Sequence, residues 1–192
     1  MLGAAPAEPG PFCGNCRRRP PPWESLVAAY LYLPPLVGVV RALKFGRGEH
    51  LGDPLSQALA ARCAPWIESI DLVTPVPLQW TRLLARGYNQ AEAVARPLAR
   101  ALGLPCRPLL RRRPRPRQAL LSRAERRRNL RGAFTPRRPL AAGIRVLLVD
   151  DVMTTGATLE SAARALRRAG AASIHVAVVA RTPDASWGEP DR

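Results

Sequence analysis

The sequence predicts an α/β protein with a mainly parallel central sheet flanked by helices, and three observations support this class. Residues 144–149 form a run of Val, Leu and Ile interrupted only by Arg145, which is typical of a strand buried on both faces. Residues 159–169 then repeat apolar side chains at helical spacing, and Gly170 follows as a C-cap. Along the rest of the chain, strand-like apolar runs alternate with helical patterns, as in proteins with a parallel sheet.

The first 33 residues are predicted to form a small arm. Residues 1–22 are rich in Pro, Gly and Ala, which indicates a loop. Residues 23–32 are apolar but fit neither the helical nor the strand period clearly, and Pro34-Pro35 ends them. We therefore divide the chain into an N-terminal arm over residues 1–33 and one domain over residues 34–185.

The other elements follow from apolar spacing and from the positions of Gly and Pro. We expect helices at residues 36–43, 50–63 and 90–102, and strands at residues 70–74, at a short segment ending at 110, and at 174–180. The strand at residues 70–74 ends at Pro75-Val76-Pro77, because proline cannot continue a central strand. Residues 111–128 are dense in Arg and lack an apolar face, so they predict a mobile loop.

Composition limits the classes of function. The chain has 192 residues, enough for one domain, and it contains no apolar run of 18 residues that would predict a membrane span. Residues 1–10 lack the pattern of a secretory signal, so we expect a cytoplasmic protein. The net charge is +16, and only one basic residue, Lys44, is a lysine. Residues 107–138 carry thirteen Arg and a single acid, Glu125, a cluster that can attract polyanions.

Directly after the apolar run, Asp150-Asp151 is followed by Val-Met and then Thr154-Thr155-Gly156-Ala157-Thr158. This order places small hydroxyl residues and one glycine at the start of the next helix. A helix N-terminus offers free N–H groups and a partial positive charge, which suit a phosphate. Gly156 permits a close approach of the backbone, and the three Thr side chains add hydroxyl donors.

The two carboxylates beside this loop must bind something other than phosphate, such as sugar hydroxyls or Mg²⁺. A ligand with a phosphate at one end and a ribose diol near it satisfies both groups. A dinucleotide fingerprint is excluded, because the further glycines that it needs do not follow at the required spacing.

Residues 147–158 resemble the phosphoribosyl pyrophosphate (PRPP) motif of type I phosphoribosyltransferases. The resemblance implies that the ribose 5-phosphate binds at Thr154, Thr155, Gly156, Ala157 and Thr158. It also implies that Asp150 and Asp151 hydrogen-bond the 2′ and 3′ hydroxyls of the ribose.

Further motifs occur in the same order as in the ComF family (ComFC/GntX-like) of type I phosphoribosyltransferase-fold proteins. They are Leu43–Arg47, Val73–Leu78, Arg86–Ala91, Gln118–Asn129 and Gly132–Phe134. The family usually carries an N-terminal cysteine-rich zinc module, of which Cys13 and Cys16 resemble the final pair. A closed zinc site usually needs four ligands, so this pair is an incomplete site, and we expect no tightly held Zn²⁺ in a single chain.

The resemblance implies a Rossmann-like fold and further roles around the ligand. Pro75, Val76 and Pro77 would form the loop that receives the pyrophosphate, and Mg²⁺ would bridge pyrophosphate and ribose oxygens. Arg86 and Asn89 are candidate second contacts, with a purely structural role at a helix start as the alternative. Lys44 and Arg47 are expected to be surface charges.

The Arg-rich segment leaves three roles open: a mobile catalytic loop that includes Arg113, Gln118 and Arg126, a DNA-binding arm, or a solvated basic loop. Together these features predict a transferase of the pentosyl glycosyltransferase class. It would bind PRPP with Mg²⁺, transfer phosphoribosyl to an unknown nucleophilic acceptor and release pyrophosphate. The alternative is an accessory factor of DNA uptake (competence) that binds single-stranded DNA, with a competence helicase as a further possible partner.

Overall fold

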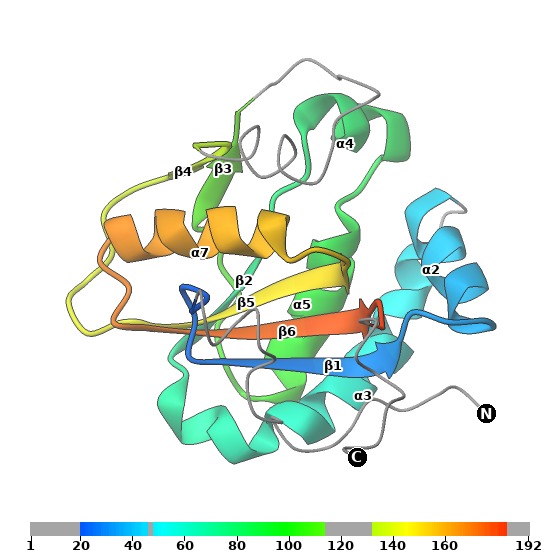
Figure 1. Ribbon diagram of the computed structural model, residues 1–192, viewed down its shortest axis with the longest axis horizontal. Coiled ribbons are helices and arrows are strands. Elements are labelled where there is room, and N and C mark those ends of the chain that lie inside the picture. Colours follow the sequence, from blue (N-terminus) through cyan, green and yellow to red (C-terminus); the bar gives the residue numbers. More distant parts are fainter. Residues whose placement is uncertain (1–19, 46–47, 114–131, 184–192) are drawn as a thin grey trace, which may run out of the picture.

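The structure is a computed structural model that describes residues 20–45, 48–113 and 132–183. A sheet of four parallel strands runs through its middle in the order β1-β6-β5-β2 (Figure 1). The strands are β1 (Ser25–Leu31), β2 (Leu72–Pro75), β5 (Arg145–Met153) and β6 (Ser173–Arg181). Residues 105–107 lie along the outer edge of β2, because Val73 N donates to Pro105 O at 2.9 Å and Arg107 N donates to Val73 O at 2.9 Å. The predicted parallel α/β architecture is confirmed.

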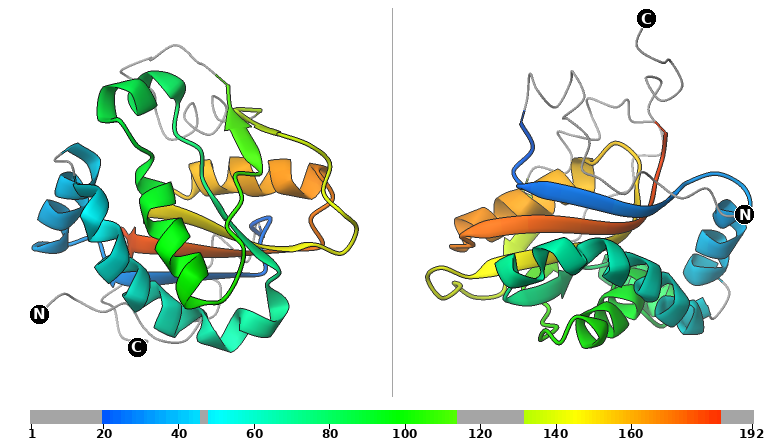
Figure 2. Two further views of the ribbon diagram at one scale, coloured as in Figure 1. Left: turned by 180° about the vertical axis from the view of Figure 1, so that it is seen from behind. Right: turned by 90° about the horizontal axis from the view of Figure 1, so that it is seen from below.

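Helices cover both faces of this sheet (Figure 2). One face is covered by α2 (Leu36–Phe45), α3 (Gly52–Cys63) and α5 (Gln90–Ala101), and the other by α7 (Ala157–Arg168). Strand β5 lies between these two layers, and its side chains alternate between them. Val146 and Leu148 pack in the cluster beneath α7, whereas Leu147 and Val149 pack in the opposite cluster.

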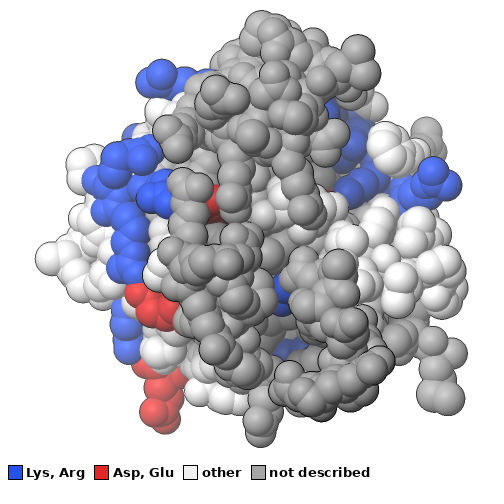
Figure 3. All heavy atoms as spheres, viewed as in Figure 1, with Lys and Arg blue, Asp and Glu red and all other residues white. Residues whose placement is uncertain are grey.

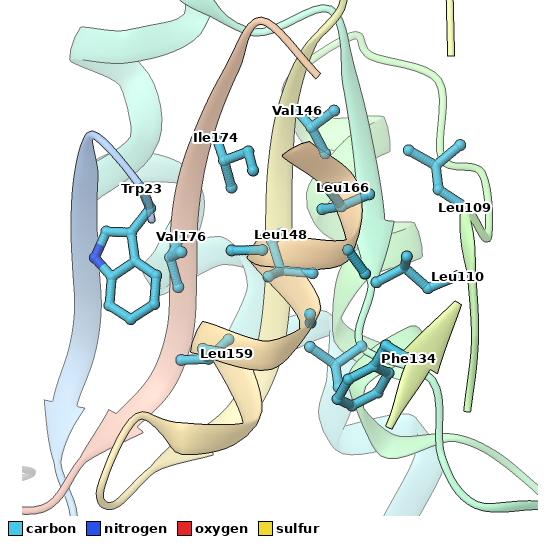
Figure 4. Packing of buried hydrophobic residues seen from close by; sticks show 14 of the residues in the cluster. Trp23, Leu109, Leu110, Phe134, Val146, Leu148, Leu159, Leu166, Ile174 and Val176 are labelled. Carbon is cyan, nitrogen blue, oxygen red and sulfur yellow. The ribbon is translucent and has the colours of Figure 1, made fainter. Parts of the chain in front are cut away.

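The α7 layer is fixed by close apolar packing (Figure 4). Leu159 and Leu166 of α7 point toward Leu148 and Val176 on the sheet, and all four side chains are buried. A separate two-stranded antiparallel sheet, β3 (Leu110–Arg112) and β4 (Phe134–Pro136), packs Leu110 and Phe134 against the same cluster. Side chains from β3 and from α2 reach the carboxyl end of β5, where they line one cavity.

Three short helical segments connect these elements: η1 (Gly48–Leu51), η2 (Ala64–Ser69) and α4 (Trp80–Arg86). Within residues 20–45, 48–113 and 132–183, no helix is long and apolar enough to cross a membrane.

The structure adds α4 and β4, which the sequence did not predict, and it differs from the prediction at β1 and β3. Strand β1 pairs with β6 from Ser25 to Leu31, so this part of the predicted arm belongs to the central sheet. Arg111 and Arg112, which we assigned to a mobile loop, lie in strand β3, where Arg112 pairs with Phe134 and Arg111 with Thr135. Residues 1–19, which include Cys13 and Cys16, lie outside the described residues.

Candidate functional site

A cavity of about 180 Å³ opens at the carboxyl ends of β2 and β5. In parallel α/β sheets, ligands bind at this end of the strands. Most of its walls are polar or charged. The lining residues are Lys44, Val76, Pro77, Leu78, Arg82, Arg86, Asn89, Gln90, Arg112, Asp150, Asp151, Val152 and Thr158.

Asp150 and Asp151 are buried at the end of β5, and both line the cavity. Asp150 interacts electrostatically with Arg112 of β3, whereas Asp151 Oδ2 lies 3.0 Å from Lys44 Nζ of α2, so the two acids meet cations from different sides of the strand. Each accepts a hydrogen bond from the next residue's N–H, Asp151 N to Asp150 Oδ1 at 2.9 Å and Val152 N to Asp151 Oδ1 at 2.7 Å. The two carboxylates are therefore held at fixed positions by their own backbone.

The two carboxyl groups, Asp150 and Asp151, have different electrostatic surroundings. Burial raises the pKa of Asp150 well above its usual value, and the neighbouring Asp151 carboxylate raises it further. Lys44 Nζ lies 3.0 Å from Asp151 Oδ2. That contact lacks hydrogen-bond geometry, so Oδ2 is a buried oxygen without a hydrogen-bond donor among the described residues. Asp150 thus takes up a proton more readily than an ordinary Asp, and Asp151 has a cation beside it.

Lys44 was expected to be a surface charge, and the structure corrects this. Its side chain is 25% exposed and faces the acid pair from the last turn of α2. Neighbouring residues hold that turn in place. The Tyr88 hydroxyl donates to Leu43 O, and a Cβ at Gly48 would lie 2.4 Å from Ala42 O, so only glycine allows this close approach. Arg47 lies outside the described residues.

Three arginines add positive charge to the cavity. Arg112 stacks over the Phe134 ring, with Cζ 5.3 Å from the ring centroid, and burial together with the nearby Arg82 lowers its pKa. Arg86 stacks over Phe45, with Cζ 4.7 Å from the ring centroid, and donates to Gln90 Oε1 at 3.0 Å. These aromatic contacts fix the direction of two guanidinium groups that line the cavity.

Helix α4 presents arginines to the cavity and apolar side chains to solvent. Arg82 and Arg86 line the cavity, whereas Trp80, Leu83 and Leu84 are exposed, and none of its seven residues is buried. Sequence reasoning expected no helix here, because an apolar face that points outward does not mark a core-facing helix.

The loop after β2 lies against the end of β5. Val76 N donates to Val149 O at 2.8 Å, and Pro77 and Leu78 continue along the cavity, while Pro75 is the last residue of β2. Asn89 braces this loop, since its Nδ2 donates to Val76 O at 3.0 Å and its Oδ1 accepts from Ala91 N at 3.2 Å. These two hydrogen bonds give Asn89 a structural role at a helix start, and since Asn89 also lines the cavity, its role as a second contact stays a prediction.

The Thr/Gly loop runs from β5 into α7. Gly156 is the residue before the helix and has φ +73°, a conformation that favours glycine. Ala157 N donates weakly to Thr155 Oγ1 at 3.5 Å, and Thr158 reaches the cavity wall. Thr154, Thr155 and Gly156 do not line the cavity and form an adjoining surface at the N-terminus of α7, while Ala157 does not line it either and its side chain is buried.

Comparison with known proteins identifies the family. A phosphoribosyl transferase domain family matches residues 88–191. "DNA utilization protein YhgH" of Salmonella typhimurium is 37% identical over 189 residues, which cover 95% of this chain and 83% of that protein. "Competence protein F" of Haemophilus influenzae is 35% identical over 88% of this chain and 78% of its own length. The chain belongs to the ComF family of phosphoribosyltransferase-fold proteins.

A more distant relative shares only the domain. "Amidophosphoribosyltransferase" of Haemophilus influenzae is 30% identical over 68% of this chain but only 24% of its own length. The ComF assignment confirms the predicted family and the type I phosphoribosyltransferase fold.

Within its described ranges, this ComF-family protein has no group of three or more His, Cys, Asp or Glu that could hold a metal ion. Cys63 is buried, and burial raises the pKa of its thiol to about 12, so it is an apolar core residue. Cys13 and Cys16 lie in the part that is not described, so the incomplete zinc site stays a prediction.

Sequence reasoning gave no ligand role to three side chains that line this ComF cavity: Lys44, Arg82 and Gln90. Two further lining residues belong to segments with a predicted role, Leu78 to the motif of the pyrophosphate loop and Arg112 to the mobile loop. One signal was available, since Lys44 is the single lysine in a chain that otherwise uses arginine. Of the predicted catalytic loop, Arg113 is described, and its N–H donates to Ala133 O at 2.9 Å. Gln118 and Arg126 lie outside the described residues, so the catalytic-loop role stays a prediction.

The raised pKa of Asp150 predicts how stability depends on pH. The pKa of Asp150 is higher in the folded than in the unfolded protein. The contribution of Asp150 to the free energy of unfolding is therefore present at low pH, and it is lost as pH rises through the folded-state pKa. We expect Asp150→Asn to raise the free energy of unfolding at pH 7, with a gain that shrinks toward pH 4. Urea denaturation of both proteins across this range measures the difference.

Asp71 supplies a control of opposite sign. Arg145 donates to its carboxylate at 3.1 and 2.7 Å and lowers its pKa. Its contribution is present at neutral pH and is lost as pH falls through the folded-state pKa, so Asp71→Asn should be less stable than wild type at pH 7. An Asp150→Asn variant that is destabilised at pH 7 in the same way would contradict the account of Asp150.

Proposed function

We propose that this protein binds PRPP with Mg²⁺ at the cavity and transfers phosphoribosyl to a nucleophilic acceptor, with release of pyrophosphate. The observation that carries the proposal is the buried acid pair beside the N-terminus of α7. The pair offers acceptors to a ribose diol, and the helix N-terminus suits a phosphate. The phosphoribosyl transferase domain supports this general kind of reaction.

Each part of PRPP has residues suited to it. Asp150 and Asp151 would accept hydrogen bonds from the ribose hydroxyls, and residues 154–158 would hold the 5-phosphate with backbone N–H groups and hydroxyls. The loop Pro75-Val76-Pro77 would receive the pyrophosphate, near the guanidinium groups that line the same cavity. Asn89 would act through this loop, since its Nδ2 donates to Val76 O.

The donor set fits a magnesium ion that arrives with its ligand. Asp150 and Asp151 are the two carboxylates in the cavity wall, and Mg²⁺ is commonly bound by one or two carboxylates together with substrate phosphates and waters. When bound, Mg²⁺ would neutralise charge on the pyrophosphate. The protein's own contribution is to position the ribose and to offset the remaining charge.

The reaction needs little covalent chemistry from the protein. The bond from C1 to the pyrophosphate oxygen breaks and its electron pair leaves with pyrophosphate, while a lone pair of the acceptor forms the new bond to C1. The acceptor then gives up a proton to water or to a phosphate oxygen. Positive charge develops on the ribose and negative charge on the leaving group, so Arg82, Arg86 and Arg112 would stabilise the departing pyrophosphate.

Removing the charge of the acid pair should weaken PRPP binding. We expect the double variant Asp150→Asn, Asp151→Asn to lose at least about tenfold in affinity, because each hydrogen bond to a charged group contributes ~1.5–3 kcal/mol. Calorimetry with PRPP, with and without Mg²⁺, measures this.

The matched control is Asp53→Asn, which removes a carboxylate that pairs with Arg100 on the surface at 3.1 Å. Its PRPP affinity should equal that of wild type. If the double variant also binds PRPP as wild type does, the assignment of the ribose site is wrong.

A second candidate function is contact with single-stranded DNA, and the name of the relative "DNA utilization protein YhgH" supports a role that involves DNA. Trp80 is 54% exposed and Phe45 is 75% exposed, and Arg86 on the helix of Trp80 stacks over Phe45. Exposed aromatic rings next to arginines suit the stacking of unpaired bases. Basic side chains outnumber acidic ones in the visible charges of one face (Figure 3), which favours attraction to phosphates.

If this second function is correct, removal of the Trp80 ring should weaken the binding of single-stranded nucleic acid. Trp80→Ala should weaken binding of a single-stranded oligonucleotide by about fivefold or more, because one stacked base contributes ~1–3 kcal/mol. Leu84→Ala, on the exposed face of the same helix, should have no effect. Fluorescence anisotropy at two salt concentrations measures both, and equal losses for the two variants would argue against stacking at Trp80.

A further inference from the structure

Lys44 is the residue whose position the proposed reaction does not explain. Its amino group lies 3.0 Å from Asp151 Oδ2, and the two residues are 107 positions apart in the chain. Asp151 is 7% exposed and Lys44 25% exposed, so the pair is largely shielded from water. An ion pair in such surroundings is stronger than one on the surface.

The chain supports this contact from two sides. Lys44 lies in the last turn of α2, where a cation also interacts favourably with the helix dipole. The Tyr88 hydroxyl and the close approach of Gly48 hold the preceding residues of this turn. These contacts place the lysine over the acid pair rather than leaving it free in solvent.

The choice of lysine is notable in this sequence. Of the 30 Lys and Arg residues, a single one is lysine, and it faces the two acids. An arginine would grip a carboxylate with two parallel hydrogen bonds, whereas a lysine is a compact point charge on a flexible stem. Lys44 approaches Asp151 at Oδ2, and this oxygen has no hydrogen-bond donor among the described residues, so it can still accept a hydrogen bond from a hydroxyl of a ligand.

Two adjacent buried carboxylates would attract a divalent cation as well as a diol. The positive charges that line the cavity are Lys44, Arg82, Arg86 and Arg112, and of these Lys44 forms an ion pair with Asp151. We propose that Lys44 is a specificity-determining residue: as an internal counter-ion of Asp151, it keeps a free divalent cation off the acid pair. The pair then stays open to a neutral ribose diol, and the metal enters only with the pyrophosphate.

That the diol belongs to a ribose rests on the proposed function. The exclusion of a free divalent cation by Lys44 does not rest on it, and this exclusion can be tested without PRPP. Mn²⁺ is the probe, because its electron paramagnetic resonance signal reports the free ion. We expect weak binding to wild type and at least about tenfold tighter binding to Lys44→Gln, because an adjacent positive charge is removed. Lys44→Arg should remain weak, and Lys44→Gln combined with Asp151→Asn should lose the gain.

Arg96→Gln is the matched control for net charge. Arg96 pairs with Glu92 on the exposed face of α5 and does not line the cavity, so this variant should bind Mn²⁺ as wild type does. The proposal is overturned if Lys44→Gln and wild type bind Mn²⁺ equally, or if Arg96→Gln gains as much as Lys44→Gln. Failure of wild type to bind PRPP would instead sink the proposed function and leave the Mn²⁺ result standing.

Discussion

The repulsion between two adjacent buried carboxylates is the constraint on which the rest of this site depends. Asp150 and Asp151 lie side by side where β5 ends, in a place that water reaches poorly. Two negative charges so close cannot both persist there without compensation. Burial and the neighbouring carboxylate raise the pKa of Asp150, which favours its protonated form. The other acid, Asp151, has the Lys44 amino group beside it.

The fold makes this division possible because the strand alternates. Asp150 continues the row of Val146 and Leu148, toward β3, whereas Asp151 continues the row of Leu147 and Val149, toward α2. One acid therefore lies near Arg112 and the other near Lys44. Because β5 is buried on both faces, cations from β3 and from α2 both reach the acid pair.

The elements that could be predicted from the sequence are those whose pattern lies within one short stretch of the chain. The apolar run of β5, the helical period of α7 and α5, and the Asp-Asp and Thr/Gly motif are local patterns, and each lies where it was expected. The edge strand β1 was not recognised, because residues 23–32 show neither period clearly and their pairing with β6 spans about 150 positions.

The partners of the acids could not be predicted because they depend on packing between distant segments. Lys44 was assigned to the surface and Arg112 to a loop, and nothing within either segment indicates an acid partner. Helix α4 was missed for a related reason, since its arginines rather than its apolar residues line the cavity. A charged cavity wall does not follow the relation between hydrophobicity and burial on which sequence patterns rely.

The single lysine permits a direct test of the central claim that the acid pair beside Lys44 receives the ribose of PRPP. Protein labelled with ¹³C at the lysine ε-carbon gives one lysine signal, which belongs to Lys44. PRPP with Mg²⁺ should shift this signal, and ribose 5-phosphate should shift it in the same direction, whereas Mg²⁺ alone should leave it unchanged. An unchanged signal at a PRPP concentration that saturates binding by calorimetry would contradict the account.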